Sequence, residues 1–184
     1  MHYFNNGNKI TNYGNRGMVL ESDINETNKY YLSNNIAVIY KKPTPIKILH
    51  LDYNTNKITN AFFETQSTLD YNGVYKGKYI EFDAKETTSK TSFPLSNIHN
   101  HQIKHIENII NNNGICFLII RFTSINKTFL LFGNDLLNFI KNEKRKSIPI
   151  SYFTENCKTI ELKYSPRLDY LKIIKEYMEE KWKY

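Results

Sequence analysis

One apolar segment, residues 115–122, constrains the fold of this chain more than any other feature. It reads Ile-Cys-Phe-Leu-Ile-Ile-Arg-Phe, with no alternation of apolar and polar residues. A continuous run of this kind, rich in β-branched residues, is typical of a buried strand. Residues 128–132 form the expected neighbouring strand. The sequence therefore predicts a fold with a covered sheet at its centre.

Helix-like and strand-like segments alternate along the rest of the chain. Apolar residues at helical spacing predict helices, and short β-branched or aromatic runs predict strands. The predicted helices span residues 15–33, 99–112, 134–142 and 167–182, and the predicted strands span 36–40, 46–53, 58–63 and 74–85, the last with a turn at Lys76-Gly77. This alternation favours an α/β or α+β layered fold. We expect one domain over residues 15–184, preceded by a flexible Asn-rich arm, residues 1–14.

Residues 41–66 form a segment with a distinct character. They begin Lys-Lys-Pro-Thr-Pro, and two prolines this close impose extended backbone and interrupt both helices and strand ladders. Two strand-like stretches follow, joined by a turn at 54–57. We expect this segment to project as a hairpin or stalk that carries Lys41, Lys42, Lys47 and Lys57.

The charge balance points to an anionic partner. The chain has 25 Lys and Arg against 18 Asp and Glu, a formal net charge of +7. Only four of the basic residues are Arg, and Lys is better suited to phosphate contacts than to reading base edges. Nucleic acid is thus the expected partner. The alternative is that the charge serves solubility in a Lys- and Asn-rich chain.

No segment indicates a membrane or a secreted protein. No apolar run approaches the roughly 18–20 residues that span a bilayer, and the N-terminus lacks a charged stretch followed by an apolar one. Two cysteines, Cys116 and Cys157, cannot form a disulfide scaffold. Cys116, inside an apolar strand, is expected to be a buried small hydrophobic residue. We expect a cytoplasmic protein without a membrane partner.

Two aspartates and a lysine could form a catalytic site. Asp70 precedes Asp83-Ala84-Lys85 by thirteen positions, and strand alternation places residues 83 and 85 on one face. Two carboxylates on neighbouring strand ends can hold a divalent cation. A lysine beside them can stabilise charge on a phosphate undergoing hydrolysis. The same spacing also occurs by chance on a solvated strand edge, so it does not settle the function.

Several sequence blocks together resemble the RecU family of Holliday junction resolvases. The resemblance runs in order from about residue 12 to at least 165. The blocks are Asn15-Arg16-Gly17-Met18, Lys41-Lys42-Pro43-Thr44-Pro45-Ile46, Leu69 to Gly77, Ala84-Lys85-Glu86-Thr87, Thr91 to Leu95, His101-Gln102-Ile103 and Ile119 to Phe122.

The resemblance implies a restriction-endonuclease-like fold, with a central mixed sheet flanked by helices and a protruding stalk. It implies a homodimer that binds four-way junction DNA and cuts two strands of like polarity with Mg²⁺, for which Mn²⁺ could substitute. It also implies contact with the recombinase RecA and a place on the nucleoid. By position, the metal site falls on Thr68, Asp70, Asp83 and Gln102, and the transition-state-stabilising lysine on Lys85. The family usually has Glu where this chain has Asp83, so we expect activity with an altered metal preference.

Other candidate residues keep two interpretations each. Glu21 could add a carboxylate to the metal site or be a solvated helix residue, which we favour. His99, His101 and His105 lack the spacing of a zinc site and are expected at the surface or facing DNA. The candidate DNA contacts also have structural alternatives, core packing for the tyrosines and ion pairing for the arginines: Tyr71, Tyr75, Lys76, Arg16 and Arg121.

Three other functions compete with a junction resolvase. A restriction-type duplex endonuclease would have the same catalytic residues, but it has no evident use for the basic stalk. A junction-binding or recombinase-modulating protein would need no catalysis, which the presence of Asp70, Lys85 and Gln102 argues against. A basic protein that only coats nucleic acid leaves the family-like blocks unexplained.

Overall fold

A computed structural model of the chain describes residues 18–64 and 68–182. The expected arm at residues 1–14 and Arg16 lie outside this range. The helices are α1 (Met18–Ser33), α2 (Asn100–Asn111), α3 (Gly133–Asn142), α4 (Ile150–Asn156) and α5 (Tyr170–Trp182), with short 3-10 turns at Leu95–Asn97 and Thr123–Ile125. None of these helices is long and apolar enough to cross a membrane.

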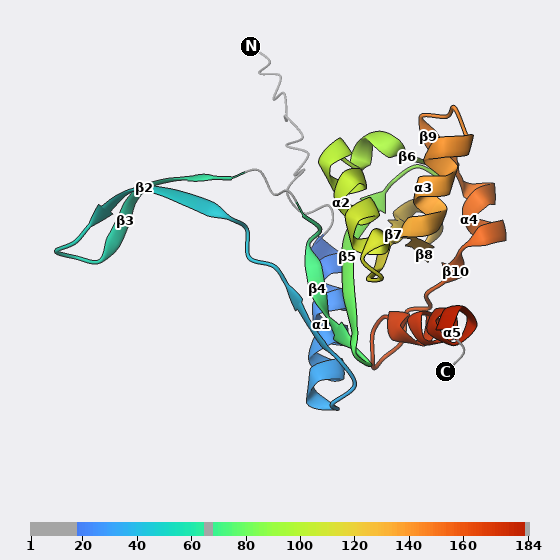
Figure 1. Cartoon of the computed structure of the whole chain (residues 1–184), viewed down its shortest axis with the longest axis horizontal. Helices are drawn as coiled ribbons and strands as arrows, with labels where there is room; N and C mark the ends of the chain where they lie inside the picture. Colours follow the sequence, from blue (N-terminus) through green and yellow to red (C-terminus); the bar gives the residue numbers. More distant parts are fainter. Residues whose placement is uncertain (1–17, 65–67, 183–184) are drawn as a thin grey trace, which may run out of the picture.

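A six-stranded mixed sheet forms the centre of the molecule (Figure 1). Its strand order is β1-β4-β5-β7-β8-β10. The strands are β1 (Val38–Lys41), β4 (Tyr71–Tyr75), β5 (Lys78–Thr87), β7 (Ile115–Phe122), β8 (Lys127–Phe132) and β10 (Lys158–Thr159). The β5–β7 pair is parallel and the other pairs are antiparallel. The predicted mixed α/β architecture is therefore confirmed.

Strand β7 explains why the sheet has two covered faces. All eight of its residues are buried. Phe117 and Ile119 belong to a core cluster with α1 and α5, whereas Leu118 and Ile120 belong to a second cluster with α2, α3 and α4. Successive side chains of a strand point to opposite faces, so an apolar run is needed where both faces are covered.

The segment after β1 forms the predicted hairpin. Strands β2 (Ile46–Asp52) and β3 (Lys57–Phe63) make a separate two-stranded sheet that extends far from the central sheet (Figure 1). Asp52 fixes the turn by accepting hydrogen bonds from the Asn54 amide at 2.9 Å and the Thr55 hydroxyl at 2.8 Å, and these bonds lower the pKa of Asp52. We refer to β2, β3 and their turn as the stalk.

The base of the stalk is anchored to the central sheet through β1. This edge strand pairs with β4, where Gly73 faces Ile39. A Cβ atom at Gly73 would lie 2.0 Å from the Val38 carbonyl oxygen, so only glycine allows this close approach. The Lys42 amide then donates to the Asp70 carbonyl at 2.7 Å. The stalk thus leaves the domain beside Asp70.

Some element boundaries differ from the predicted ones. The last helix begins at Tyr170 instead of residue 167, because Leu168 forms a bridge with Leu162. Helix α4 was not predicted, nor was the small sheet of β6 (Ser92–Pro94) and β9 (Ser147–Pro149). The other predicted helices and strands are present within a few residues of their expected limits.

Candidate active site

Asp83 is the centre of a polar cluster inside the sheet. Its side chain is completely buried, and strand β5 directs it to the face covered by α2. One carboxylate oxygen, Oδ2, lies 2.7 Å from Lys85 Nζ and accepts a hydrogen bond from Gln102 Nε2 at 2.8 Å. The other, Oδ1, accepts the Ala84 amide at 2.8 Å. Asp83 and Lys85 therefore share one face, as strand alternation predicts.

Asp70 lies immediately before β4 and interacts with Asp83. Its pKa is raised to about 6, first by burial and then by the charge of Asp83 and a hydrogen bond with it. Lys85 opposes the shift, and Glu21 adds to it. Two carboxylates this close cannot both ionise freely without a cation between them. The pair is thus arranged to take up either a proton or a metal ion.

Of the remaining predicted ligands, Gln102 contacts Asp83, and Thr68 is close to Asp70 along the chain. Thr68 is half-buried, two residues before Asp70. Gln102 sits in the first turn of α2, and its oxygen accepts the His99 amide at 3.1 Å while its nitrogen faces Asp83. Gln102 therefore contacts Asp83 through its amide nitrogen, which is a hydrogen-bond donor, while its oxygen accepts from the His99 amide.

The donor set suits a hard divalent cation. Mg²⁺ is commonly held by one or two carboxylates, with waters and substrate phosphate completing its shell. Asp70 and Asp83 supply two carboxylates. No group of three His, Cys, Asp or Glu side chains able to hold a metal occurs in the part of the chain that the structure describes. The other ligands would then come from neutral oxygens, such as that of Thr68, from water and from substrate.

A third buried carboxylate, Glu81, was missed by the sequence reasoning. It lies two positions before Asp83 on the same face of β5 and forms an ion pair with Lys42. It also contacts His105 Nε2 at 2.8 Å and accepts from the Tyr79 hydroxyl at 2.7 Å. Although burial raises the pKa of Glu81, the bonds from these three partners lower it overall. The alternation that pointed to residues 83 and 85 extends to 81 and could have revealed it.

The candidate DNA contacts fall in different places. Lys47 and Lys57 lie on the exposed stalk, and Lys76 is exposed at the turn between β4 and β5. Tyr71 and Tyr75 are buried in the core cluster under α1 and α5. The remaining three described candidates make ion pairs: Lys41 with Glu21 at the surface, Lys42 with the buried Glu81 and Arg121 with the buried Asp23.

The histidines and cysteines follow the simpler expectations. His99 and His101 are exposed and stack on each other with ring centroids 5.3 Å apart. His105 is half-buried against Glu81. Cys116 is buried, and burial raises the pKa of its thiol.

The Asp70 pKa predicts a stability change of definite sign. A folded-state pKa of about 6, above the ordinary value of 3.8, contributes stability that is present at low pH and lost as the pH rises through 6. Asp70→Asn should therefore raise the unfolding free energy of the metal-free protein by about 1–3 kcal/mol at pH 8. The gain should vanish near pH 4. Urea unfolding in EDTA at both pH values measures it, and a variant less stable than the parent at pH 8 would contradict it.

Comparison with known proteins places the chain in a family. It matches the family described as RecU, Recombination protein U, over residues 15–176. A Holliday junction resolvase RecU of Pediococcus pentosaceus is 52% identical over 173 residues, which are 91% of this chain and 86% of that protein. A Holliday junction resolvase RecU of a Geobacillus species is 50% identical over 171 residues, 90% of this chain and 85% of that protein. The chain belongs to the RecU family of recombination proteins.

Proposed function

We propose that this protein is a Mg²⁺-dependent endonuclease that resolves Holliday junctions by nicking two strands symmetrically, in homologous recombination and DNA repair. The observation that carries the proposal is the buried Asp83 held by Lys85 and Gln102, with Asp70 beside it. Relatives of about 50% identity named Holliday junction resolvase support the choice of substrate.

The side chains of the site have separate tasks in this reaction. Asp70 and Asp83 would hold the cation, and Gln102 keeps the Asp83 carboxylate oriented through its amide. A bound Mg²⁺ supplies Lewis acidity and a water of lowered pKa. The Lys85 ammonium lies next to the carboxylates, where it can offset negative charge that develops on the scissile phosphate.

The stalk supplies the features that a branched substrate requires. Its exposed apolar and aromatic side chains include Phe63, 77% exposed, and Tyr53, 84% exposed. Aromatic rings of this kind can stack on unpaired bases at an open branch point, and Lys47 and Lys57 can contact phosphates. An isolated two-stranded hairpin with an apolar surface is marginal in water, which favours a binding role.

A homodimer would match the approximate two-fold symmetry of a junction. An exposed apolar strip supports it: Val38, Val74 and Tyr79 lie opposite one another across β1, β4 and β5. A second copy that covers this strip would bring two sites and two stalks together.

Contact with RecA and a nucleoid location are the remaining parts of the proposal, and they rest on the family resemblance alone.

Cleavage of a mobile synthetic four-way junction tests the proposal. The protein is incubated with Mg²⁺ or Mn²⁺ and junction, beside linear duplexes of the same sequences and an Asp70→Asn control. The expected result is paired symmetric nicks on the junction alone, lost in the variant. Tight binding without cleavage in either metal would contradict the enzyme and leave a junction-binding protein. Cleavage of the linear duplex at discrete sequences would favour a restriction-type enzyme instead.

A further inference from the structure

A dense basic cluster covers residues 141–146, the last two residues of α3 and the loop that leads to β9, which together we call the loop. Residues 141–146 read Lys-Asn-Glu-Lys-Arg-Lys, and all six are exposed. The loop carries a charge of +3, four cations minus one anion, in six residues. Arg145 Nε lies 3.8 Å from a Glu143 carboxylate oxygen, but the Arg145 side chain is still 62% exposed. Lys144 and Lys146 have no ion-pair partner within the described ranges.

The loop is held firmly at both ends. The Glu143 amide donates to the Phe139 carbonyl at 2.8 Å, and Phe139 is buried in the core cluster that contains α3. On the other side the Leu95 amide donates to the Lys146 carbonyl at 2.9 Å, next to the pairing of the fully buried Phe93 and Ile148. The backbone therefore presents these cations from a fixed position, which lowers the ordering cost of binding.

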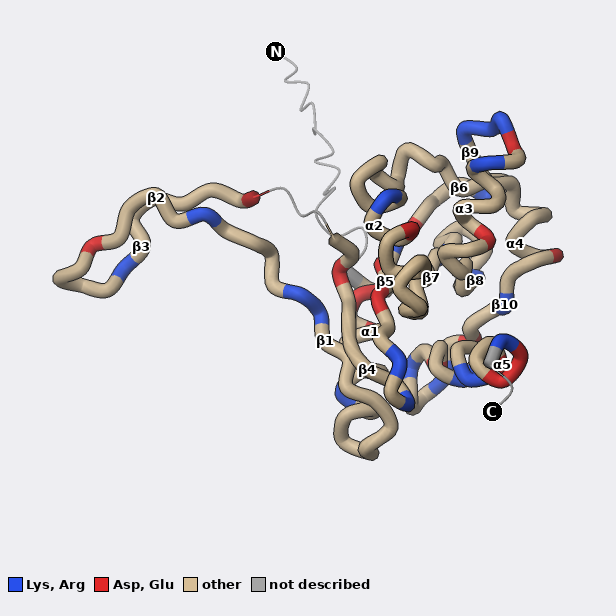
Figure 2. The backbone as a smooth tube through the Cα atoms, viewed as in Figure 1, with Lys and Arg blue, Asp and Glu red and all other residues tan. Residues whose placement is uncertain are grey.

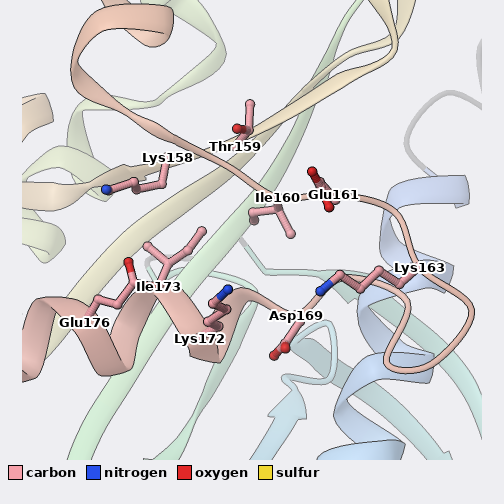
Figure 3. A pocket seen from close by; sticks show the side chains of 9 residues that line it. All are labelled: Lys158, Thr159, Ile160, Glu161, Lys163, Asp169, Lys172, Ile173 and Glu176. Atoms are coloured by element: carbon pink, nitrogen blue, oxygen red, sulfur yellow. The ribbon is translucent and has the colours of Figure 1, made fainter.

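Another lysine-bearing surface has a different charge balance. Beside β10 and α5, a pocket of about 260 Å³ is lined by Lys158, Lys163 and Lys172 (Figure 3). The same pocket is lined by three acidic residues, Glu161, Asp169 and Glu176, so its net charge is zero. A surface of this kind has no preference for a polyanion. The pocket also lies on the sheet face covered by α5, whereas residues 141–146 lie on the opposite face.

The position of the basic loop relative to the stalk suggests its partner. The stalk extends from one end of the molecule, the sheet with β5 lies in the middle, and the blue segment at β9 lies beyond it, away from the stalk (Figure 2). A duplex arm that starts at a branch point on the stalk and passes the carboxylates continues as a rod in that direction. Its phosphates form an unbroken row of negative charge.

We propose that the loop of residues 141–146 is a second DNA-binding surface, which contacts the phosphate backbone of a junction arm beyond the cleaved position. The inference rests on the proposed function for the identity of the arm. The contacts would be made by Lys144, Arg145 and Lys146 to phosphates and would be independent of sequence. They would fix the direction of the arm across the active site.

Salt-dependent binding to junctions of two sizes tests this surface. One junction has arms of about 8 base pairs and the other of about 25, so the arms differ by roughly 58 Å at 3.4 Å per pair. The triple variant Lys144→Gln/Arg145→Gln/Lys146→Gln is compared with Lys158→Gln/Lys163→Gln/Lys172→Gln, which removes the same charge elsewhere. Affinity is measured in Ca²⁺ or EDTA over a range of salt concentrations.

The loop variant should weaken binding of the long-armed junction by about tenfold or more. The slope of the logarithm of the association constant against the logarithm of the salt concentration should fall in magnitude by about 2–3. Binding of the short-armed junction should be weakened less, because its arms extend less far beyond the branch point. The control variant should leave the long-arm slope near that of the parent.

Three outcomes would overturn the inference: an unchanged slope, an equal reduction in the control variant, or an equal loss on short and long arms. These results are separable from failure of the proposed function. A parent protein that does not cut junctions, together with a loop variant that still lowers the slope on long arms, would remove the resolvase and leave the DNA-binding surface.

Discussion

Lys85→Met is expected to slow junction cleavage by about 10²–10³-fold in a single-turnover assay, at saturating protein and Mg²⁺. Lys85 Nζ lies 2.7 Å from a carboxylate oxygen of Asp83. In the proposed reaction its ammonium would offset the charge that develops on the phosphate, beside a carboxylate that is shielded from water. Met keeps an unbranched side chain and most of its volume, is one atom shorter, and removes the charge.

Junction affinity should remain within about threefold of the parent, since one partly buried cation adds little to a backbone interface of many contacts. Loss of the ammonium also removes a cation that competes with the metal beside Asp83, so the variant should need no more Mg²⁺ than the parent for half-maximal rate. Lys90→Met, at an exposed loop position, is the matched control and should cleave normally. If Lys85→Met regains the parental rate at high Mg²⁺, the lysine acts only on metal binding.

The sequence predicts the central strands of the sheet more completely than the short peripheral helix α4. The run 115–122 identified β7 because both faces of the strand are buried, and its apolar residues have no other stable environment. Helix α4 was missed because it has only seven residues, and Phe153 alone is fully buried. Tertiary packing against α3 and β9 stabilises such a short helix, and a local pattern does not report that packing.

The same distinction applies to the site. Asp83 and Lys85 are two positions apart on one strand, so their contact follows from strand geometry alone. The partners of Glu81 come from elsewhere: Lys42 lies 39 positions away, at the base of the stalk, and His105 lies 24 positions away, on α2. The pairing depends on how β1, β5 and α2 assemble. A buried carboxylate can be suspected from alternation, but the cations that neutralise it cannot be assigned without the fold.

Asp23→Ala is expected to lower the free energy of unfolding by about 3–5 kcal/mol, the largest stability loss that we predict. Asp23 Oδ2 lies 2.8 Å from Arg121 Nη2, and Oδ1 lies 3.1 Å from Arg167 Nη2. Asp23 and Arg121 are both buried, and together they join α1 to β7. Removal of the carboxylate leaves the Arg121 guanidinium without its main partner; among the described residues, Thr128 Oγ1 at 3.2 Å and Glu86 at 3.9 Å remain nearby.

Urea unfolding at pH 7 measures the loss, with two variants for comparison. Asp23→Asn keeps the size of the side chain and one acceptor oxygen but replaces the other oxygen with an NH2 donor, which cannot accept from an arginine, so it should fall between the parent and Asp23→Ala. Glu107→Ala breaks the exposed Lys104–Glu107 pair and should change stability by less than about 1 kcal/mol. The contrast would show that burial of the pair, and not ion pairing as such, determines the cost.

Urea unfolding and junction binding of Asp23→Ala together decide whether Arg121 is a DNA contact or a structural ion-pair partner, the two interpretations of the sequence. In the ion pair with Asp23, Arg121 is only 9% exposed and has little surface left for a phosphate. If Arg121 instead contacted DNA, loss of Asp23 would free its charge, so Asp23→Ala would bind junctions more tightly and unfold near the parental urea midpoint. We expect the opposite: a large loss of stability and, below the unfolding transition, unchanged junction affinity in a filter-binding or fluorescence assay.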